Sequence, residues 1–344
     1  MNFDKNIFPK ISIVTPSFNQ GEFLEETILS VLEQNYPNLE YIIIDGGSTD
    51  NSVEIIKKYE KKLAYWVSEK DRGQSHAINK GLQKCTGEIF NWLNSDDCYL
   101  SNTLRKVAEG FANKNTFLLC GKSNLFKINS ENLIAEGTFF DPNDFAKTLA
   151  VLHIEQPSTF FRMSAVKKMG ELSERLHFVM DKEWWLTYLL NFGTGNSVKT
   201  NTVFVNFRYH KKSKTVLHSD QFYNEHASIL HSIALQKNKN EYAKLLEIKY
   251  NILKNYKFDA EGLTDELFDR MIRYFLLKRG YLIFEKKDFE HAQKMMKIIA
   301  FEDLNLDEQE KRQFKKMKKQ IRFTSWLLFR INRKINFIFK NSNL

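Results

Sequence analysis

The sequence predicts an α/β protein built on a mostly parallel sheet, followed by a helical region. Three observations predict this class. Short apolar runs alternate with amphipathic stretches over the first ~120 residues. Shorter strands and helices mix between residues 117 and 210, and from about Ser219 onward the apolar spacing is helical throughout. Near-continuous apolar strands joined by amphipathic helices are typical of a parallel sheet covered on both faces.

The elements follow in order along the chain. The first four predicted strands are 11–15, 39–45, 64–68 and 89–93, and they are separated by helices within 22–34, 48–56 and 75–84. Ser48-Thr49-Asp50 and Ser101 supply N-cap chemistry for two helices. Further strands are predicted at 116–121, 123–128, 133–138, 159–162 and 203–209, and helices at 219–236, 241–255, 264–285, 288–300 and 308–339. This pattern divides the chain into residues 1–215, with the sheet, and a helical region, residues 216–344.

The positive charge is confined to the end of the chain. The 344 residues carry 51 Lys+Arg and 42 Asp+Glu, a net charge of +9. From Lys311 to the end there are 11 basic and no acidic residues, so the rest carries a net −2. Because the main body is not basic and contains no recognised nucleic-acid module, nucleic-acid binding is disfavoured.

Targeting and cysteine signals favour a cytoplasmic protein. No run of ~18 apolar residues is present to span a membrane, and the N-terminus has no apolar stretch typical of a secretory signal. The odd number of cysteines, with neither disulfide nor zinc spacing, indicates a reducing compartment: Cys85, Cys98 and Cys120.

Polar residues gather after each of the first four strands. They lie at Thr15–Asn19, Asp45–Ser48, Glu69–Gln74 and Asn94–Asp97. Ligands of open parallel sheets bind beyond the carboxyl ends of the strands. The sequence therefore predicts a binding site at this edge.

Asp96 and Asp97 form an acidic pair in one of these loops. Adjacent carboxylates repel each other unless a cation compensates, and a divalent ion bridging a diphosphate is a common compensation. A solvated acidic turn is the alternative.

Two further loop residues suit a nucleotide. Asp45 precedes two glycines and can accept a hydrogen bond from a uracil N–H or a ribose hydroxyl; the alternative is an Asx-turn or a helix cap. Arg72 can hold a phosphate bidentately, or it forms a surface ion pair.

Taken together, these segments resemble a family 2 glycosyltransferase with the GT-A fold. The likeness covers residues ~10–215 and rests on TPSFNQ (15–20), IIIDGGSTDNS (42–52), EKDRG (69–73), INKGL (78–82), GEIFNWLNSDD (87–97), QPSTFFR (156–162), MDKEWWLTYL (180–189) and FRYHKKSKT (207–215). Each motif is moderately specific by itself, and their common order and spacing make the resemblance specific.

The resemblance implies a role for each site residue. Thr15, Pro16, Asn19 and Asp45 would hold the base and ribose, Arg72 would contact the nucleotide, and Ser95 and Asp96 would touch the ribose or sugar. Asp97 would ligate Mg²⁺ or Mn²⁺, and His210 matches a residue that contacts metal or diphosphate. A solvated hairpin end is the alternative for His210 and the lysines after it.

Asp181 matches the catalytic base of the family. It opens a helix on which Trp184, Trp185 and Leu189 can pack, which would hold the carboxylate rigidly. A helix N-cap is a compatible reading of Asp181. Glu183 is the rival base, but two residues further along it points to another helix face. Attack opposite the leaving group would invert the sugar configuration.

The basic tail, residues 311–340, interleaves lysine and arginine with aromatic and aliphatic residues. Helices of this kind can lie on anionic membranes, which suits a lipid-anchored acceptor such as a glycan on a polyprenyl carrier. Docking of the tail on the protein body is the alternative.

The sequence thus favours a metal-dependent, inverting glycosyltransferase that uses a nucleotide-sugar, expected to be UDP-linked, in bacterial surface polysaccharide or cell-envelope glycan synthesis. The expected location is cytoplasmic, or peripheral on the inner face of the plasma membrane. A nucleotidyltransferase on a similar sheet is an alternative, although the loop after the first strand has no basic residue. A membrane-surface binding protein with a vestigial donor site is the non-enzymatic alternative.

Overall fold

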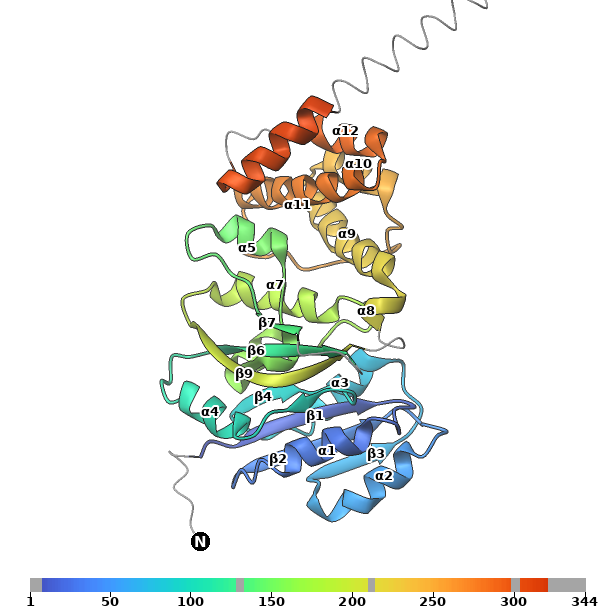
Figure 1. Cartoon of the computed structure of the whole chain (residues 1–344), viewed down its shortest axis with the longest axis vertical. Coiled ribbons are helices and arrows are strands. Elements are labelled where there is room, and N and C mark those ends of the chain that lie inside the picture. Colours follow the sequence, from blue (N-terminus) through green and yellow to red (C-terminus); the bar gives the residue numbers. More distant parts are fainter. Residues whose placement is uncertain (1–7, 128–132, 210–213, 298–303, 321–344) are drawn as a thin grey trace, which may run out of the picture. The chain divides into compact units, whose positions relative to one another are not determined.

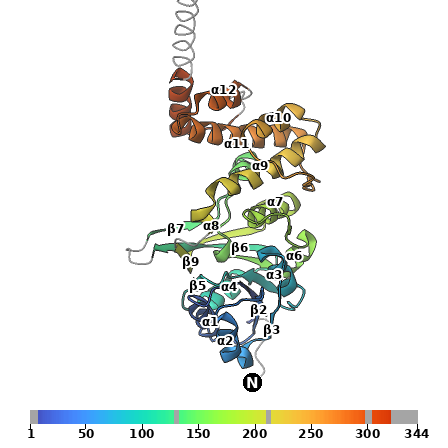
Figure 2. The same cartoon turned by 90° about the vertical axis from the view of Figure 1, so that its right-hand side faces the viewer.

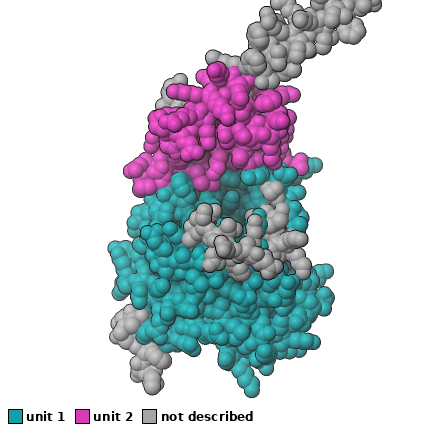
Figure 3. All heavy atoms as spheres, viewed as in Figure 1, with its two compact units in different colours: residues 1–140, 152–229, 252–262 teal, residues 141–151, 230–251, 263–344 magenta. Residues whose placement is uncertain are grey.

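The computed structural model describes residues 8–127, 133–209, 214–297 and 304–320. The chain forms two compact units (Figure 3). The first unit comprises residues 1–140, 152–229 and 252–262, and the second comprises residues 141–151, 230–251 and 263–344. Division of the chain at residue 215 remains a prediction.

A nine-stranded mixed sheet forms the centre of the first unit (Figure 1). Eight strands lie in the order β3 (Tyr65–Ser68), β2 (Leu39–Asp45), β1 (Ile11–Ser17), β4 (Ile89–Trp92), β8 (Thr159–Arg162), β6 (Leu118–Lys127), β9 (Ser197–Tyr209) and β5 (Cys98–Tyr99), and β7 (Leu133–Gly137) pairs with β6. The first four are parallel. β8 is antiparallel to both β4 and β6, so it reverses the direction in the middle of the sheet.

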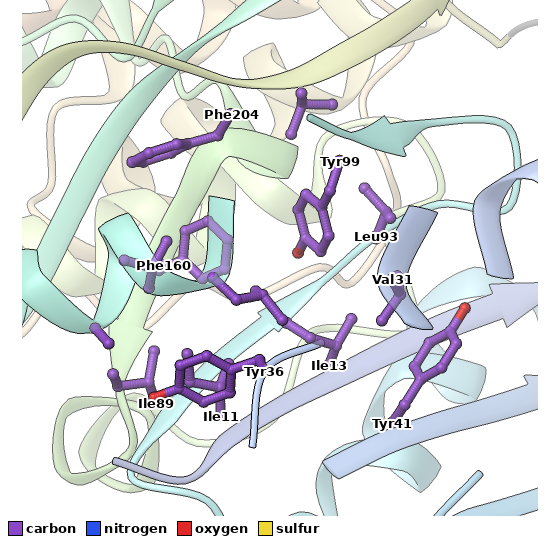
Figure 4. Packing of buried hydrophobic residues seen from close by; sticks show 14 of the residues in the cluster. Ile11, Ile13, Val31, Tyr36, Tyr41, Ile89, Leu93, Tyr99, Phe160 and Phe204 are labelled. Atoms are coloured by element: carbon purple, nitrogen blue, oxygen red, sulfur yellow. The ribbon is translucent and has the colours of Figure 1, made fainter. Parts of the chain in front are cut away.

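One face of the sheet is covered by α1 (Leu24–Leu32), α2 (Ser52–Tyr59) and α4 (Thr103–Gly110). Alternate residues of β1 and β2, among them Ile13 and Tyr41, pack with Val31 of α1 in one apolar cluster (Figure 4). Since side chains of a strand alternate between its two faces, the residues between them face the opposite side.

The opposite face is covered by α3 (Gln74–Leu82), α6 (Met163–Met169) and α7 (Met180–Phe192) (Figure 2). Gly81 of α3 lies so close to Val14 that a Cβ there would come within 2.5 Å of the valine side chain. The indole rings of Trp92 and Trp184 are 5.5 Å apart, which joins α7 to β4. This packing fixes the first turn of α7 relative to the end of β4.

The second unit is helical among its described residues. It contains α5 (Phe145–Val151), the end of α9 (Ser219–Gln236), α10 (Asn240–Lys249), α11 (Asp265–Glu285), α12 (Phe289–Lys297) and a helix over residues 308–320. The buried carboxylate of Asp144 accepts hydrogen bonds from Tyr274 at 2.6 Å and Arg270 at 3.1 Å, which ties α5 to α11. Residues 321–340 of the predicted basic tail lie outside the described residues. None of the described helices is long and apolar enough to cross a membrane.

The predicted order of strands and helices is confirmed over the described residues, with local differences. Residues 118–127, predicted as parts of two strands, form the single strand β6, and β9 begins at Ser197 rather than at 203. The short strand β5 was not predicted, and α10 ends at Lys249 rather than at 255. The predicted cap of α4 at Ser101 is wrong, since α4 begins after Asn102, whose φ is +63°. α2 begins after Asn51, and of its three predicted cap residues Asp50 accepts from the Ser52 amide at 3.0 Å. Ser48 does not cap the helix, because its Oγ accepts from the Asn19 amide and its hydroxyl donates to Asp45.

Glu40 of β2 is the most heavily hydrogen-bonded carboxylate at the amino-terminal edge of the sheet. It accepts from Lys10 at 2.6 Å, Ser12 at 2.5 Å, and the amide and hydroxyl of Thr86 at 2.6 Å each. Burial pushes the pKa of Glu40 upward, but the donors from Lys10, Ser12 and Thr86 outweigh it and hold the pKa at about 2. The network joins β1, β2 and the loop before β4.

Replacing Glu40 with Gln should lower the free energy of unfolding by about 1–3 kcal/mol at pH 7, because buried donors lose a charged acceptor. Since the pKa is depressed in the folded state, this contribution is complete above pH 4.5 and is lost as the pH falls toward about 2. Urea unfolding at pH 7 and pH 3 measures both effects. The exposed Glu54→Gln variant is the control, and equal stability losses for the two variants would contradict this role for Glu40.

Candidate active site

Two loops at the carboxyl edge of the sheet are joined by a series of hydrogen bonds. The Asn19 amide donates to Ser48 Oγ at 2.8 Å, and the Thr49 amide donates to Asn19 Oδ1 at 2.8 Å. The Gly21 amide donates to Asp50 Oδ2 at 2.9 Å. Asn19 has a left-handed φ of +51°, which asparagine tolerates better than most residues. The loops after β1 and β2 therefore form one surface.

Asp45 is fully buried at the end of β2. Its carboxylate accepts from the amides of Gly47 and Ser48 at 3.1 and 2.9 Å, and from the hydroxyls of Ser48 and Ser68 at 2.5 and 2.7 Å. The Asx-turn reading is therefore observed, and Asp45 shapes the loop that would face a ligand. Direct contact with a base or ribose remains a prediction.

Other predicted nucleotide ligands have structural contacts. Thr15 is buried within β1, with its hydroxyl 3.1 Å from Tyr41 Oη, and Pro16 is also buried. Arg72 forms a bidentate ion pair with Glu174, at 2.6 and 2.8 Å. The Arg72 side chain is 67% exposed, and exposed ion pairs contribute only ~0–1 kcal/mol, so this pair can open for an anionic ligand.

Asp97 is a buried carboxylate without an ion-pair partner among the described residues. It is 1% exposed, its Oδ1 accepts from the Arg208 amide at 3.1 Å, and its Oδ2 lies 3.4 Å from Asn94 Nδ2. The guanidinium of Arg208 bonds Glu26 and the Asp96 carbonyl instead. Burial first, and then the charge of Asp96, raise the pKa of Asp97 well above its usual range.

The donor set at this position fits a divalent cation. Asp96 and Asp97 offer adjacent hard oxygen ligands, which Mg²⁺ and Mn²⁺ prefer, and a bound cation would remove the cost of burying an ionised carboxylate. The described ranges contain no group of three His, Cys, Asp or Glu side chains placed to hold a metal. His210, the second predicted ligand, lies outside the described residues. Ser95 is buried beside the pair, and its contact with ribose or sugar remains a prediction.

A hydrogen-bonded chain links the acidic loop to α8 (Lys214–Leu217). Gln74 Nε2 donates to Asn94 Oδ1 at 2.8 Å, and Lys214 Nζ donates to Gln74 Oε1 at 2.9 Å and to the His177 carbonyl at 3.1 Å. Desolvation lowers the pKa of Lys214, while the carboxylates of Glu225, Asp181 and Asp96 oppose this shift. One ammonium is therefore in electrostatic range of both the acidic loop and the predicted base.

Asp181 lies in the first turn of α7, as predicted, and it is half-buried. The N-cap residue is Val179, so the N-cap reading of Asp181 does not hold; its Oδ1 accepts from the Lys182 amide at 2.8 Å. Burial raises the pKa of Asp181, and Lys182 and Lys214 partly counter that rise. The anchors Trp184, Trp185 and Leu189 are all buried, as expected.

Glu225 of α9 holds the segment before α7. Its carboxylate accepts from the amides of His177, Phe178 and Val179 at 2.8–3.1 Å, which satisfies donors at the helix N-terminus. The carboxylate of the rival base Glu183 accepts a hydrogen bond from the Tyr256 hydroxyl at 2.5 Å. This contact supports the expectation that Glu183 faces away from Asp181.

Sequence reasoning missed several of these residues. Gln74 and Arg208 lie inside motifs that were recognised, but nothing in a single sequence signals their partners. Glu225 lies beyond the motifs in a region read only as helical. Phe18 is 58% exposed beside Asn19, and an exposed aromatic in the middle of TPSFNQ was an available signal for stacking on a base.

Replacing Asp97 with Asn should raise the melting temperature of the metal-free protein at pH 7. Because the pKa of Asp97 is raised in the folded state, its cost to stability is complete above the folded pKa, shrinks as the pH falls below it, and is gone below the ordinary value of 3.8. Each ~1 kcal/mol recovered corresponds to about 2–4 °C for a domain of this size. Thermal unfolding in EDTA at pH 7 and pH 5 measures the gain, which should shrink at the lower pH. A lower melting temperature for the variant would show that the carboxylate is compensated.

The family model described as Glycosyl transferase family 2 matches residues 12–170. An uncharacterised glycosyltransferase of Mycobacterium tuberculosis (strain CDC 1551 / Oshkosh) is 30% identical over 183 residues, which are 52% of this chain and 68% of the relative. TuaG of Bacillus subtilis (strain 168), described as a putative teichuronic acid biosynthesis glycosyltransferase, is 36% identical over 104 residues, 29% of this chain and 41% of that protein. Matches to the first four curated relatives span 40–60% of their lengths.

Solved structures show the same fold. Residues 1–349 of TarS from S. aureus superpose with a TM-score of 0.54 at 16% identity, covering 84% of this chain and 90% of that one. The same fragment in complex with UDP gives a TM-score of 0.52 at 16% identity, with 85% and 81% covered. The predicted GT-A type fold with a helical C-terminal region is confirmed. The sequence relationship and the fold together place the chain in glycosyltransferase family 2.

Proposed function

We propose that this glycosyltransferase is metal-dependent and inverting, and that it moves a sugar from a UDP-sugar to a hydroxyl of a glycan or lipid-linked acceptor in cell-envelope synthesis. The observation that carries the proposal is the buried carboxylate of Asp97, which has no ion-pair partner among the described residues. Its loop is hydrogen-bonded through Gln74 to Lys214, whose ammonium is in electrostatic range of Asp181. A TarS fragment has been solved in complex with UDP, and TuaG is described as a putative teichuronic acid biosynthesis glycosyltransferase. Both support this donor and this setting.

The donor would lie over the loops after β1, β2 and β4. Phe18 offers an exposed ring for stacking on the base, and the loop held by Asp45 would face the ribose. Asp96 and Asp97 would hold Mg²⁺ or Mn²⁺, with His210 as a further ligand. A divalent ion there stabilises the charge that develops on a leaving diphosphate.

Asp181 would act as the general base. Its raised pKa makes it a stronger base than an ordinary aspartate, which suits removal of a proton from an acceptor hydroxyl. The acceptor oxygen forms a bond to the anomeric carbon while the bond from that carbon to the diphosphate oxygen breaks. Attack from the face opposite the diphosphate inverts the configuration. Lys214 and Arg72 are the cations available to the departing diphosphate.

The basic tail would bring this chemistry to an anionic membrane surface. Residues 311–340 carry the excess positive charge of the chain, and each basic residue near such a surface contributes ~1 kcal/mol of attraction. A peripheral position on the inner face of the plasma membrane and a polyprenyl-linked acceptor follow from this part of the proposal.

A thermal-shift screen tests the donor and the metal. UDP with Mn²⁺ should raise the melting temperature of the wild type, because a ligand at 100 times its Kd stabilises the native state by ~2.7 kcal/mol.

Replacing Phe18 with Ala should lower the affinity for UDP about 3–10-fold, as the loss of ~0.5–1.5 kcal/mol of stacking implies. Asp97→Asn should remove the additional effect of Mn²⁺. No response to any nucleotide would refute the proposed donor class.

Replacing Asp181 with Asn should lower kcat at least ~10²-fold while UDP binding is retained, since general base catalysis contributes ~10²–10⁴. Glu183→Gln, two residues away on the same helix, is the matched control and should keep most activity. Sugar transfer and UDP release are measured together, and the anomeric configuration of the product is read by NMR. Equal losses in the two variants, or a retained configuration, would exclude Asp181 as the base of an inverting reaction.

A further inference from the structure

The second unit contains a cavity that the donor chemistry does not use. Its volume is about 270 Å³, and it lies between α5, α11 and the helix over residues 308–320. Apolar and aromatic side chains form most of its wall: Ala150, Val151, Tyr274, Leu277, Tyr281, Leu282, Phe314 and Met317. Ala150, Tyr274 and Met317 are at most 5% exposed, so the wall continues into the core of this unit.

The charges on the cavity wall do not cancel, because two lysines and one glutamate line it. Lys147 is neutralised by Glu310 at 2.9 Å. Lys278 lines the same cavity, is exposed to solvent, and has no ion pair or hydrogen bond from its amine among the described residues. Desolvation lowers the pKa of Lys278, the nearby charges of Arg279 and Lys147 act in the same direction, and the Glu310 carboxylate opposes them. An apolar cavity with one excess positive charge at its rim is complementary to a hydrocarbon chain that carries an anionic head.

We infer that this cavity is a binding site for a single-chain lipid with an anionic head group, whose chain packs on Leu277, Phe314 and Met317 and whose head pairs with Lys278. The chain's own tail suits the site less well. Residues 321–344 carry five basic and no acidic residues, so they would bring further positive charge to a rim that is already positive. The site is independent of the proposed donor chemistry, because none of its residues belongs to the first unit.

Isothermal titration of the full-length protein with dodecyl phosphate, below its micellar concentration, tests the site. The wild type should bind with a stoichiometry of one. Lys278→Glu should weaken binding at least tenfold by reversing the charge at the rim, and Ala150→Phe should do the same by filling the cavity. Lys286→Glu, an exposed position outside the cavity wall on the turn after α11, is the control for net charge and should bind like the wild type.

Two further arms separate this site from general attraction to membranes. Dodecyl maltoside, which has the same chain and a neutral head, should bind at least tenfold more weakly than dodecyl phosphate. Vesicles of phosphatidylglycerol should bind Lys278→Glu and Lys286→Glu equally, because a vesicle surface would attract the tail rather than fill the cavity. Absence of saturable binding to the wild type, or equal affinities of Lys278→Glu and Lys286→Glu for dodecyl phosphate, would overturn the inference. If Ala150→Phe alone loses its cooperative melt, the charge-reversal pair still decides the result.

Discussion

The burial of one carboxyl group, that of Asp97, is the constraint on which the organisation of this edge of the sheet depends. A carboxylate removed from water must be compensated, and among the described residues its hydrogen-bond donors are an amide from β9 and the side-chain amide of Asn94 at 3.4 Å. The nearest guanidinium, that of Arg208, is engaged by Glu26 and a carbonyl oxygen. Asp96 and Asp97 thus place two carboxyl groups, one of them buried, at the point where the proposed donor would lie.

The surrounding loops are held by hydrogen bonds within the protein, which do not depend on a ligand. The carboxylate of Asp45 accepts hydrogen bonds from its own turn and from Ser68. The side-chain oxygen of Asn19 accepts from an amide of the neighbouring loop. Glu225 similarly fixes the segment that leads to Asp181. Residues of this kind position the groups that touch substrate, so their replacement would displace a loop rather than remove a single contact.

Much of this arrangement could be predicted from the sequence. Apolar runs such as 39–45 indicate buried strands, and the polar residues that follow such strands share one edge of a parallel sheet, which predicted the loops of Asp45 and Asp97. Asp181 was predicted from the family resemblance and not from the strand pattern. Contacts between distant segments could not be predicted. No local signal couples Arg72 to Glu174 or Gln74 to Lys214, because such pairs depend on how loops of different lengths meet. The predicted cap at Ser48 failed for a related reason, because its Oγ accepts instead from the amide of Asn19 in the loop after β1.

The dependence of Asp97 on β9 also has a consequence for biosynthesis. The amide that contacts its carboxylate comes from a residue 111 positions later in the chain. While the ribosome is still adding those residues, β1 to β4 can already pair, but the acidic loop has no such contact and its two charges stay in water. Contacts over such long separations form late, after the entropy of closing the loop has been overcome. A nascent chain that ends before β9 would thus carry all the polar loops of the first four strands and still lack the contact that holds the Asp97 carboxylate in the folded protein.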